Sequence, residues 1–417
     1  MSKIQVNQLK TKLIFKQKVL LLQNIQICHL KKLLVLLFLI TFTNVVRAYD
    51  ALIDGVYYNL YQSSSIAVVT NEKDYVINGS DIYSGTIEIP ETIQFNGKTY
   101  KVTEIGKYAF FGSKISSVSL PNSITTIGDR AFLGCEYLRS VKIPANVINI
   151  GIYAFAECDK ILEIYIPENV TSIGEGAFNR CSCLRSIKVD ERNAQYDSRE
   201  DCNAIIETHT NTIIAGCKNS IIPNTIEVIG MQSFAGCKEL TSIQLPQSIS
   251  DIGECAFAES GLSNILIPNS VNLIGTGAFQ NTNLKTVTIP KSVTIIENGA
   301  FSGNDSLTTI YLEDGVGLIC SNAFASCENL KDVYCYSENV PSTKGDGIFG
   351  GYYQNAILHV PPKAIDNYKN NAVWNRQFNK IVSIEDNGRT NILLWIPVFI
   401  ISVFIFFWIF KKTRLKK

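Results

Sequence analysis

One unit of 22–23 residues recurs along the sequence nine times, and this repeat limits the possible folds more than any other feature. Every unit contains the dipeptide Ala-Phe, once Ser-Phe, and an isoleucine stands five residues before each phenylalanine. The nine phenylalanines are Phe110, Phe132, Phe155, Phe178, Phe234, Phe257, Phe279, Phe301 and Phe324. A unit this short cannot bury an apolar face alone, so we expect similar coils to stack at a spacing of about 4.8 Å.

Each unit has the pattern of a short strand followed by a turn. In one unit, Val141 and Ile143 alternate with Lys142, which is the period of a half-buried strand, and a proline follows. The next segment, Val-x-x-Ile-Gly-x-x-Ala-Phe, should turn back with its apolar side chains inward. Glycine follows the isoleucine in seven units, but Glu297 and Cys320 replace it in two, so that position does not strictly require positive φ. Nine stacked strands would form a sheet about 40 Å long.

The repeat is interrupted once. One step between successive phenylalanines measures 56 residues, because an insert at about 190–218 lengthens it. Two β-like runs in this insert, 204–207 and 212–215, flank a polar turn. We expect an elaborated coil with a small hairpin that protrudes from the solenoid.

Small β caps are expected at both ends of the repeat region, 105–340, because the end coils would otherwise expose apolar faces. In the N-terminal cap, 49–104, the pair Asn96-Gly97 between two β-like runs is a strong hairpin signal. The C-terminal cap, 341–388, begins with a stretch containing four glycines, 345–351, which we expect to be a flexible loop. The other elements expected in this cap are a strand at 356–360, a short helix at 363–371 and a strand at 380–384, with Trp374 and Phe378 sealing the last coil.

Both ends of the chain carry targeting patterns. Two lysines, an apolar run and small residues near Ala48 predict a secretory signal peptide at 1–48, and an uncleaved N-terminal anchor is the alternative. The segment 392–410 has 19 residues without a charge and predicts a transmembrane helix, followed by a cytoplasmic basic tail, 411–417. A wall-sorting signal is less favoured, because no Leu-Pro-x-Thr-Gly precedes it. The repeats would then lie outside the cytoplasm, at the cell surface or in the periplasm.

Composition excludes several classes of function. Residues 1–48 contain eight basic residues and 411–417 contain five, and neither segment contains an acid. The rest of the chain has 25 basic and 37 acidic residues, a net charge of −12, which argues against a nucleic-acid partner. Only three histidines are present, so a multi-histidine metal site is excluded. No phosphate-binding loop or nucleophile signature occurs, and we expect no cofactor, no metal and no catalytic residue.

Five of the twelve cysteines occupy one position of the repeat, three residues after the phenylalanine. They are Cys135, Cys158, Cys181, Cys237 and Cys327, and Ser113, Ser260, Thr282 and Asn304 replace them in other coils. A position that accepts these four residue types indicates a stacked polar ladder that satisfies backbone groups of the turn, in preference to ligation or catalysis. Cys202 and Cys217 are the pair to test first for a disulfide.

The unit Leu-x-x-Val-x-Ile-Pro-x-x-Val-x-x-Ile-Gly-x-x-Ala-Phe-x-x-Cys resembles the repeats of BspA-like leucine-rich repeat proteins, over roughly residues 85–340. The resemblance implies a β-rich, right-handed leucine-rich repeat solenoid in a surface or secreted protein. It also implies adhesion to host proteins or to other cells. No ligand-binding residue can be carried over, because the motif residues of the family are structural.

A ligand surface is the remaining candidate for function. The outward strand position holds Lys142, Tyr165, Lys188, Gln244, Leu266, Thr288, Tyr311 and Tyr334. Tyrosines are typical of binding patches, although they are also favoured at any solvent-facing β position. We therefore expect a membrane-anchored binding protein whose partner is a protein or glycan on host or neighbouring cells. The alternatives are an envelope hydrolase that uses the insert around His209, and a purely structural spacer.

Overall fold

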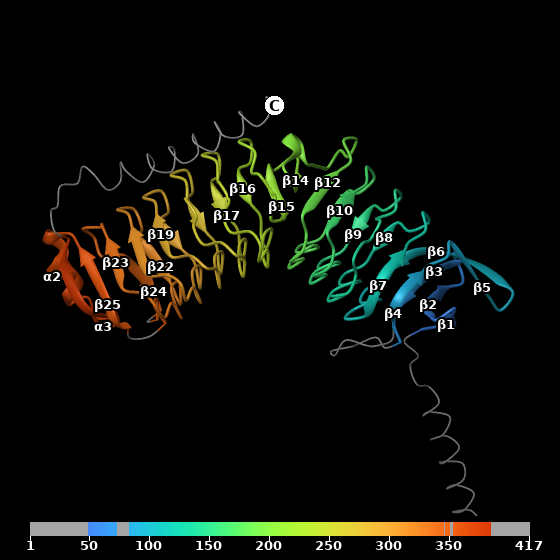
Figure 1. Ribbon diagram of the computed structural model, residues 1–417, viewed down its shortest axis with the longest axis horizontal. Coiled ribbons are helices and arrows are strands. Elements are labelled where there is room, and N and C mark those ends of the chain that lie inside the picture. The colour runs from blue at the N-terminus through green and yellow to red at the C-terminus, as the bar shows by residue number, and fades with distance from the viewer. Residues whose placement is uncertain (1–48, 73–82, 346, 351–352, 385–417) are drawn as a thin grey trace, which may run out of the picture.

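The computed structural model describes residues 49–72, 83–345, 347–350 and 353–384, which form one arched stack of coils (Figure 1). The expected signal peptide, 1–48, the expected membrane helix, 392–410, and the basic tail, 411–417, lie outside these residues. Within the described ranges, every helix is too short or too polar to span a bilayer.

Most coils contribute two β segments, where the sequence predicted one strand and a turn, and some contribute only the shorter segment. The predicted strand is present as β4 (Ser84–Glu88), β7 (Lys114–Ser119), β10 (Glu163–Ile166), β12 (Ser186–Val189), β19 (Thr286–Ile289), β21 (Thr309–Leu312) and β23 (Asp332–Cys335). A second, shorter segment follows as β8 (Thr126–Ile127), β9 (Asn149–Ile150), β11 (Ser172–Ile173), β16 (Val228–Ile229), β17 (Asp251–Ile252), β18 (Leu273–Ile274), β20 (Ile295–Ile296), β22 (Leu318–Cys320) and β24 (Ser342–Lys344). The solenoid therefore has a long-strand face and a short-strand face.

The coils pair in parallel with equal register. On the short-strand face, Ile127 is the partner of Ile105 in the preceding coil and of Ile150 in the following one. The same pairing of repeat isoleucines continues through β16, β17, β18, β20 and β22. Equal register places identical repeat positions above one another, so each position of the unit becomes a column along the rod.

The expectation of one long sheet of nine strands was wrong on both faces. The short segments divide into two sheets, one that ends at β11 and one that continues through β16 to β24. The long-strand face divides into the pairs β4–β7 and β10–β12 and a five-stranded sheet that begins with β19. The insert accounts for the break after β12. The amide of Ile187 donates to Asn203 Oδ1 (3.0 Å) and the amide of Ile221 donates to the carbonyl of Cys202 (2.9 Å), so hydrogen bonds there go to the insert.

The repeat phenylalanines form the centre of the core. Their rings stack with centroids 5.0 Å apart for Phe132 and Phe155 and 5.3 Å apart for Phe257 and Phe279. Phe349 continues the column 5.5 Å beyond Phe324, with its side chain fully buried. The prediction of a flexible loop at 345–351 was therefore wrong for this part of the segment, because Phe349 belongs to a further coil that lacks the Ala-Phe dipeptide.

The turn around each phenylalanine uses left-handed backbone at two positions. In one coil these are Tyr153 (φ 53°) and Glu157 (φ 58°), two residues before and two after Phe155. The glycine after the repeat isoleucine has a different cause. A Cβ on Gly174 would lie 2.3 Å from the amide nitrogen of Ile152, so close packing of neighbouring coils excludes a side chain there.

The insert forms the predicted hairpin, but the hairpin does not protrude. It consists of β14 (Ala204–Glu207) and β15 (Thr212–Gly216), which pair antiparallel, with β13 (Tyr196–Asp197) beside β14. Ile205, Ile206 and Ile213 are all fully buried. Burial on both faces is the physical reason for the correction, since a run such as Ala-Ile-Ile is typical of a strand covered on two sides.

The hairpin is a partition between two cores. Ala204, Ile206 and Ile213 pack with the C-terminal core, which extends to Ile381. Ile205 and Ala215 pack with the N-terminal core, which begins at Ala51. Because successive side chains of a strand point to opposite faces, one hairpin closes both cores.

The N-terminal β elements include the predicted hairpin. Strands β1 (Ala51–Ile53), β2 (Val56–Tyr61) and β3 (Ile66–Thr70) are antiparallel, and β5 (Thr92–Phe95) pairs with β6 (Lys98–Ile105). Asn96 (φ 50°) and Gly97 (φ 76°) both have positive φ, as a two-residue hairpin turn requires. Strand β6 then pairs with β8 and leads into the first coils.

At the C-terminal end, both predicted strands are present, but the single helix predicted between them is divided into shorter helices. Strands β25 (Tyr353–Val360) and β26 (Phe378–Ser383) continue the long-strand face, with the 3-10 helix η2 (Pro362–Ala364) and helices α2 (Ile365–Asn370) and α3 (Ala372–Gln377) between them. Asn371 interrupts the expected single helix. Its side chain accepts hydrogen bonds from the backbone amides of Val373 and Trp374, so it is the N-cap of α3. Trp374 is fully buried and contacts Phe349 and Phe378.

Candidate ligand-binding surface

The structure brings the predicted outward residues together in two runs. In the N-terminal half, Tyr165 is the cross-strand partner of Lys188, and Tyr165 is 51% exposed. In the C-terminal half, Thr288, Tyr311 and Tyr334 are successive partners across β19, β21 and β23. Lys142 and Gln244 are exposed in coils where no strand forms at these positions. The register confirms a shared outward position within each of the two runs, and the role of the column in binding stays a prediction.

The C-terminal run is an ordered ladder of rings. The rings of Tyr311 and Tyr334 stack with centroids 5.0 Å apart, and His359 stacks on Tyr334 at 4.2 Å. Sequence reasoning missed His359, although it stands two residues before Pro361, the spacing that five of the eight outward residues have to a proline. We call Tyr311, Tyr334 and His359 the ring ladder.

Asp332 fixes the end of the ring ladder. Its carboxylate Oδ1 lies 2.8 Å from Nε2 of His359, which links β23 to β25. Burial raises the pKa of Tyr311 and of Tyr334, and the charge of Asp332 adds to the effect, so both phenols keep their protons above the ordinary tyrosine range. The tyrosines are therefore hydrogen-bond donors over the whole neutral range.

Tyr165 belongs to a separate charged cluster. Its hydroxyl donates to Asp190 Oδ2 (2.7 Å), and Arg192 donates to both oxygens of the same carboxylate at 3.0 Å. These bonds, those from Arg192 first, hold the pKa of Asp190 well below its usual range. Hydrogen bonding to Asp190 raises the pKa of Tyr165. The cluster orients this tyrosine without a ring neighbour.

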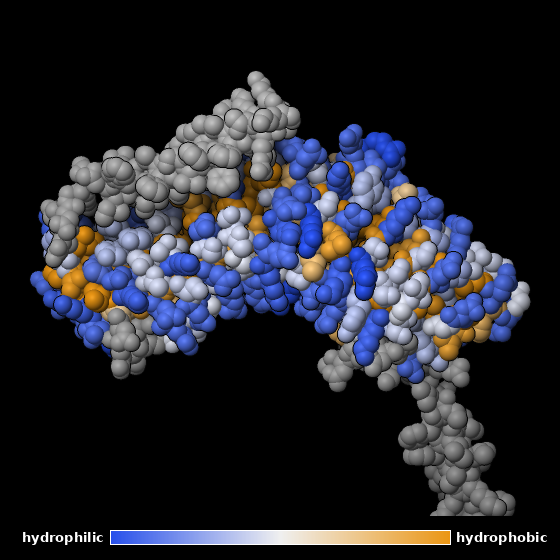
Figure 2. Space-filling view, in the orientation of Figure 1, coloured by the Kyte–Doolittle hydropathy of each residue, from blue (hydrophilic) through white to orange (hydrophobic). Residues whose placement is uncertain are grey.

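Between the two runs the outward column holds two aliphatic side chains and Gln244. Ile221 is 67% exposed and Leu266 is 64% exposed, more than any other large hydrophobic side chain in the described ranges. Ile221 also stands two residues before a proline, and sequence reasoning omitted it from the column. Figure 2 shows a hydrophobic area near the middle of the arch, beside β15, β16 and β17.

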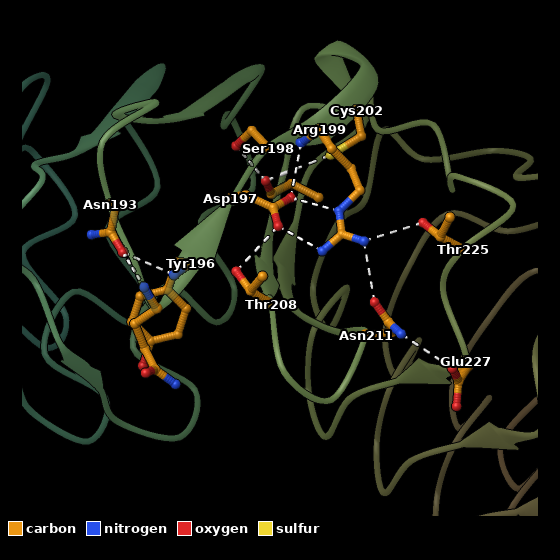
Figure 3. Close-up of polar contacts among 12 residues, drawn as sticks. Asn193, Tyr196, Asp197, Ser198, Arg199, Cys202, Thr208, Asn211, Thr225 and Glu227 are labelled. Atoms are coloured by element: carbon orange, nitrogen blue, oxygen red, sulfur yellow. Dashed lines mark hydrogen bonds and ion pairs between the residues drawn. The ribbon is translucent and has the colours of Figure 1, made fainter.

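The polar residues of the insert form a closed network (Figure 3). Arg199 donates to both oxygens of Asp197 (2.9 and 2.6 Å) and to Asn211 Oδ1 (3.1 Å). Burial favours the protonated form of Asp197, but the bonds from Arg199 outweigh it and lower the pKa of this carboxyl. Figure 3 shows these side chains directed at one another, so the network stabilises the insert and leaves little capacity for a ligand.

His209, the residue of the hydrolase alternative, lies exposed at the turn between β14 and β15. In the part of the chain that the structure describes, its imidazole forms no hydrogen bond, and the carboxylate of Glu207 accepts from Thr210 (2.7 Å). A general base acts on a nucleophile within hydrogen-bond reach. The structure does not place such a partner beside His209.

The cysteine column is the predicted polar ladder. Cys135 donates to the carbonyl of Phe110 (3.1 Å), Cys158 to that of Phe132 (3.2 Å) and Cys181 to that of Phe155 (3.1 Å). Asn304 uses the same position to donate to the carbonyls of Phe279 (2.8 Å) and Phe301 (2.7 Å). Burial raises the pKa of Cys181 and of Cys327 to about 12, so these thiols are poor nucleophiles.

The eleven cysteines in the described part of the chain are all free thiols. Cys202 and Cys217 are buried thiols whose Sγ atoms lie near different backbone carbonyls, those of Ala204 (3.7 Å) and Asn203 (3.5 Å). Among residues 49–72, 83–345, 347–350 and 353–384, no group of three or more metal-ligating side chains converges.

The family model described as the BspA-type leucine-rich repeat region matches residues 103–210 and 214–331, in six copies. This is more than half of the chain. The chain belongs to the BspA-type leucine-rich repeat family. The match spans the coils from β6 to β22, and the gap between its two segments falls in the hairpin of the insert. The matched residues include Tyr165, Lys188, Thr288 and Tyr311 of the outward column, and Tyr334 lies beyond their end.

Solved structures show that bacterial repeat proteins share this fold. The pneumococcal vaccine antigen PcpA is 18% identical and covers 80% of this chain and 98% of its own, with a TM-score of 0.59. A leucine-rich repeat protein from Eubacterium ventriosum is 19% identical and covers 82% of this chain and 96% of its own, with a TM-score of 0.54. No curated protein matches the sequence. At these identities the similarity shows the BspA-type fold alone.

Proposed function

We propose that this BspA-type protein is a membrane-anchored, extracytoplasmic binding protein that attaches to a protein or glycan on host or neighbouring cells. Membership of a family of leucine-rich repeat surface proteins supports binding or adhesion. The signal pattern at 1–48 and the apolar segment at 392–410 support export and anchoring. The ligand contacts the long-strand face.

The ring ladder is the observation that carries this proposal. Tyr311 and Tyr334 stack on one another, so their rotamers are fixed before a ligand arrives. A pre-ordered side chain loses little entropy on binding, and tyrosine contributes a large contact area with a hydroxyl at its end. Buried core columns cannot offer such contacts, because their side chains face inward.

Cell adhesion measures the proposal directly. We expect the double substitution Tyr311→Ala and Tyr334→Ala to reduce binding of expressing cells to host cells or matrix protein at least about tenfold, as for loss of central interface tyrosines. Tyr137→Ala is the matched control, because Tyr137 is 54% exposed but lies outside the outward column.

Exposure and folding are checked in the same experiment. Protease added to intact cells should cleave the repeat region, and both variants should melt near the temperature of the wild type. Adhesion that is equal for the double variant and the wild type, with both folded and exposed, would remove the ring ladder from the ligand surface.

A further inference from the structure

The tyrosine of the N-terminal run differs from those of the ring ladder, because no other ring covers it. The planes of Tyr311 and Tyr334 differ by 17° and those of Tyr334 and His359 by 12°, so each ring of the ladder covers its neighbour. Tyr165 is half exposed and stacks on no other ring in the described part of the chain. Its partner in β12 is Lys188, but β10 pairs with no strand of the preceding coil. The ring face toward that coil is therefore the more open one.

Hydrogen bonds hold Tyr165 in one orientation. Its hydroxyl donates to Asp190 Oδ2 (2.7 Å), and Arg192 donates to the same carboxylate through Nε and Nη2 (3.0 Å each). This Nη2 also forms an ion pair with Glu168 Oε2 (2.6 Å). The Nη1 group of Arg192, Oε1 of Glu168 and the lone pairs of the tyrosine hydroxyl take part in none of these contacts. A ligand that reaches the ring therefore meets both hydrogen-bond donors and hydrogen-bond acceptors beside it.

The charges around Tyr165 cancel. The segments 136–144, 159–168 and 182–192 carry this part of the long-strand face, and together they contain six basic and six acidic residues. A surface without net charge attracts neither an anion nor a cation over a distance. It suits a neutral ligand whose groups both donate and accept hydrogen bonds, as hydroxyl groups do.

We propose that Tyr165 stacks on a pyranose ring and that the N-terminal run of the outward column binds a neutral glycan. The face of an aromatic ring carries partial negative charge, and the C–H groups on one side of a pyranose ring carry partial positive charge. The hydroxyls of the same sugar reach the donors and acceptors beside Tyr165. The inference rests on the proposed function, since it names the ligand class of the same long-strand face. A polypeptide is the competing class of ligand.

The test measures binding of maltohexaose, cellohexaose and chitohexaose to the full-length protein by titration calorimetry, in a polyoxyethylene detergent because it carries no sugar. We expect at least one of these neutral oligosaccharides to bind, with an affinity that changes less than about twofold between low and high salt, since salt screens only charged contacts. Tyr165→Ala should weaken binding at least about fivefold, as for loss of an interface aromatic side chain. Tyr61→Ala is the matched control, because Tyr61 is 54% exposed in the N-terminal cap, and it should bind as the wild type does.

Two further variants separate stacking from the other roles of the side chain. Tyr165→Phe keeps the ring but loses the hydrogen bond to Asp190, so its affinity should fall by roughly two- to threefold. Tyr165→Leu keeps an apolar side chain without a ring face and should bind as weakly as Tyr165→Ala. All variants should melt near the temperature of the wild type. Equal affinity of folded Tyr165→Leu and the wild type would overturn the stacking.

Other results would overturn the glycan assignment itself. Failure of all three oligosaccharides to bind would do so, and so would an affinity that falls steeply with salt. Adhesion that is lost in Tyr165→Ala but is not inhibited by an excess of any of the oligosaccharides would assign the surface to a polypeptide. Loss of adhesion in the double variant of Tyr311 and Tyr334, without oligosaccharide binding by the wild type, would refute this inference and leave the proposed function intact.

Discussion

At the residue scale, the glycine after the repeat isoleucine is explained by the distance between coils. A Cβ on Gly174 would lie 2.3 Å from Ile152 N and 2.5 Å from the carbonyl carbon of Gly151. Both are backbone atoms, which cannot rotate away. Packing therefore restricts this position to glycine. Where Glu297 or Cys320 occupies it, the backbone of the preceding coil must lie farther away.

Gly174→Ala should lower the free energy of unfolding by about 1–3 kcal/mol, as overpacking in a tight core does. Gly317→Ala is the control, since its Cβ would come no closer than 3.6 Å to another atom and its φ is not positive. Urea titrations of both variants measure the difference. Equal midpoints for the two variants would contradict the packing explanation.

Much of the residue pattern was predictable because the period is constant. Once Val141 and Ile143 were assigned inward, equal register fixed the orientation of every equivalent residue, including Tyr311 and Tyr334. Phe349 and His359 were missed because their coil lacks the Ala-Phe marker by which the coils were counted. The spacing to Pro361 carried the missing signal for His359.

At the scale of elements, the cysteine column links stability to pH. Burial raises the pKa of Cys181 from 9.0 to about 12, so the folded state favours the protonated thiol. A raised folded-state pKa contributes stability that is complete below about pH 9 and is lost as the pH rises toward about pH 12. Cys327 follows the same rule.

The triple variant Cys158→Ser, Cys181→Ser and Cys327→Ser should therefore lose less stability than the wild type between pH 7 and about pH 10.5. Serine is compatible with the column, because Ser113 and Ser260 occupy it in other coils. Urea midpoints at the two pH values measure the effect. An alkaline loss as large in the variant as in the wild type would show that other groups, such as buried tyrosines, dominate.

The elements that sequence could not predict are those set by neighbours. Short strands such as β9 and β17 contain only two residues each and exist because a parallel coil lies beside them. The hairpin β14–β15 was predicted, but its place inside the array depends on which faces the adjoining coils leave open. The local sequence pattern predicts that a strand forms, but contacts with neighbouring coils decide whether that strand is buried.

At the scale of the molecule, several contacts on the turn side hold the joint at the insert, among them the bond from the Asn179 side chain to Gln232 Oε1 (2.8 Å) and that from the amide of Arg180 to the carbonyl of Ala235 (3.0 Å). Arg180 pairs with Glu259 across Gly236, and the amide of Gln232 donates to the hydroxyl of Tyr153 (2.9 Å) across Gly176. A Cβ on either glycine would collide with the crossing side chain. These bonds join the two halves where the phenylalanine column is interrupted by the insert.

The substitutions Arg180→Ala and Gln232→Ala remove the ion pair with Glu259 and the hydrogen bond to Tyr153. Each substitution should change the free energy of unfolding by less than about 1 kcal/mol, because the groups are partly exposed. The angle between the halves should become less restricted, and small-angle X-ray scattering should show a changed maximum dimension. Lys107→Ala, which removes an exposed ion pair with Asp129 in the N-terminal coils, is the control. Identical scattering for the wild type, the double variant and the control would mean that these two side-chain contacts do not restrict the angle.

The partition formed by β14 and β15 has a mechanical consequence. Each side of the hairpin completes a separate core, one reaching Ala51 and the other reaching Ile381. A molecule stretched between a cell and its target would therefore extend in two events, one for each half. The half that yields first would lengthen the tether while the other half stays intact, so the attachment could absorb a sudden pull without being released.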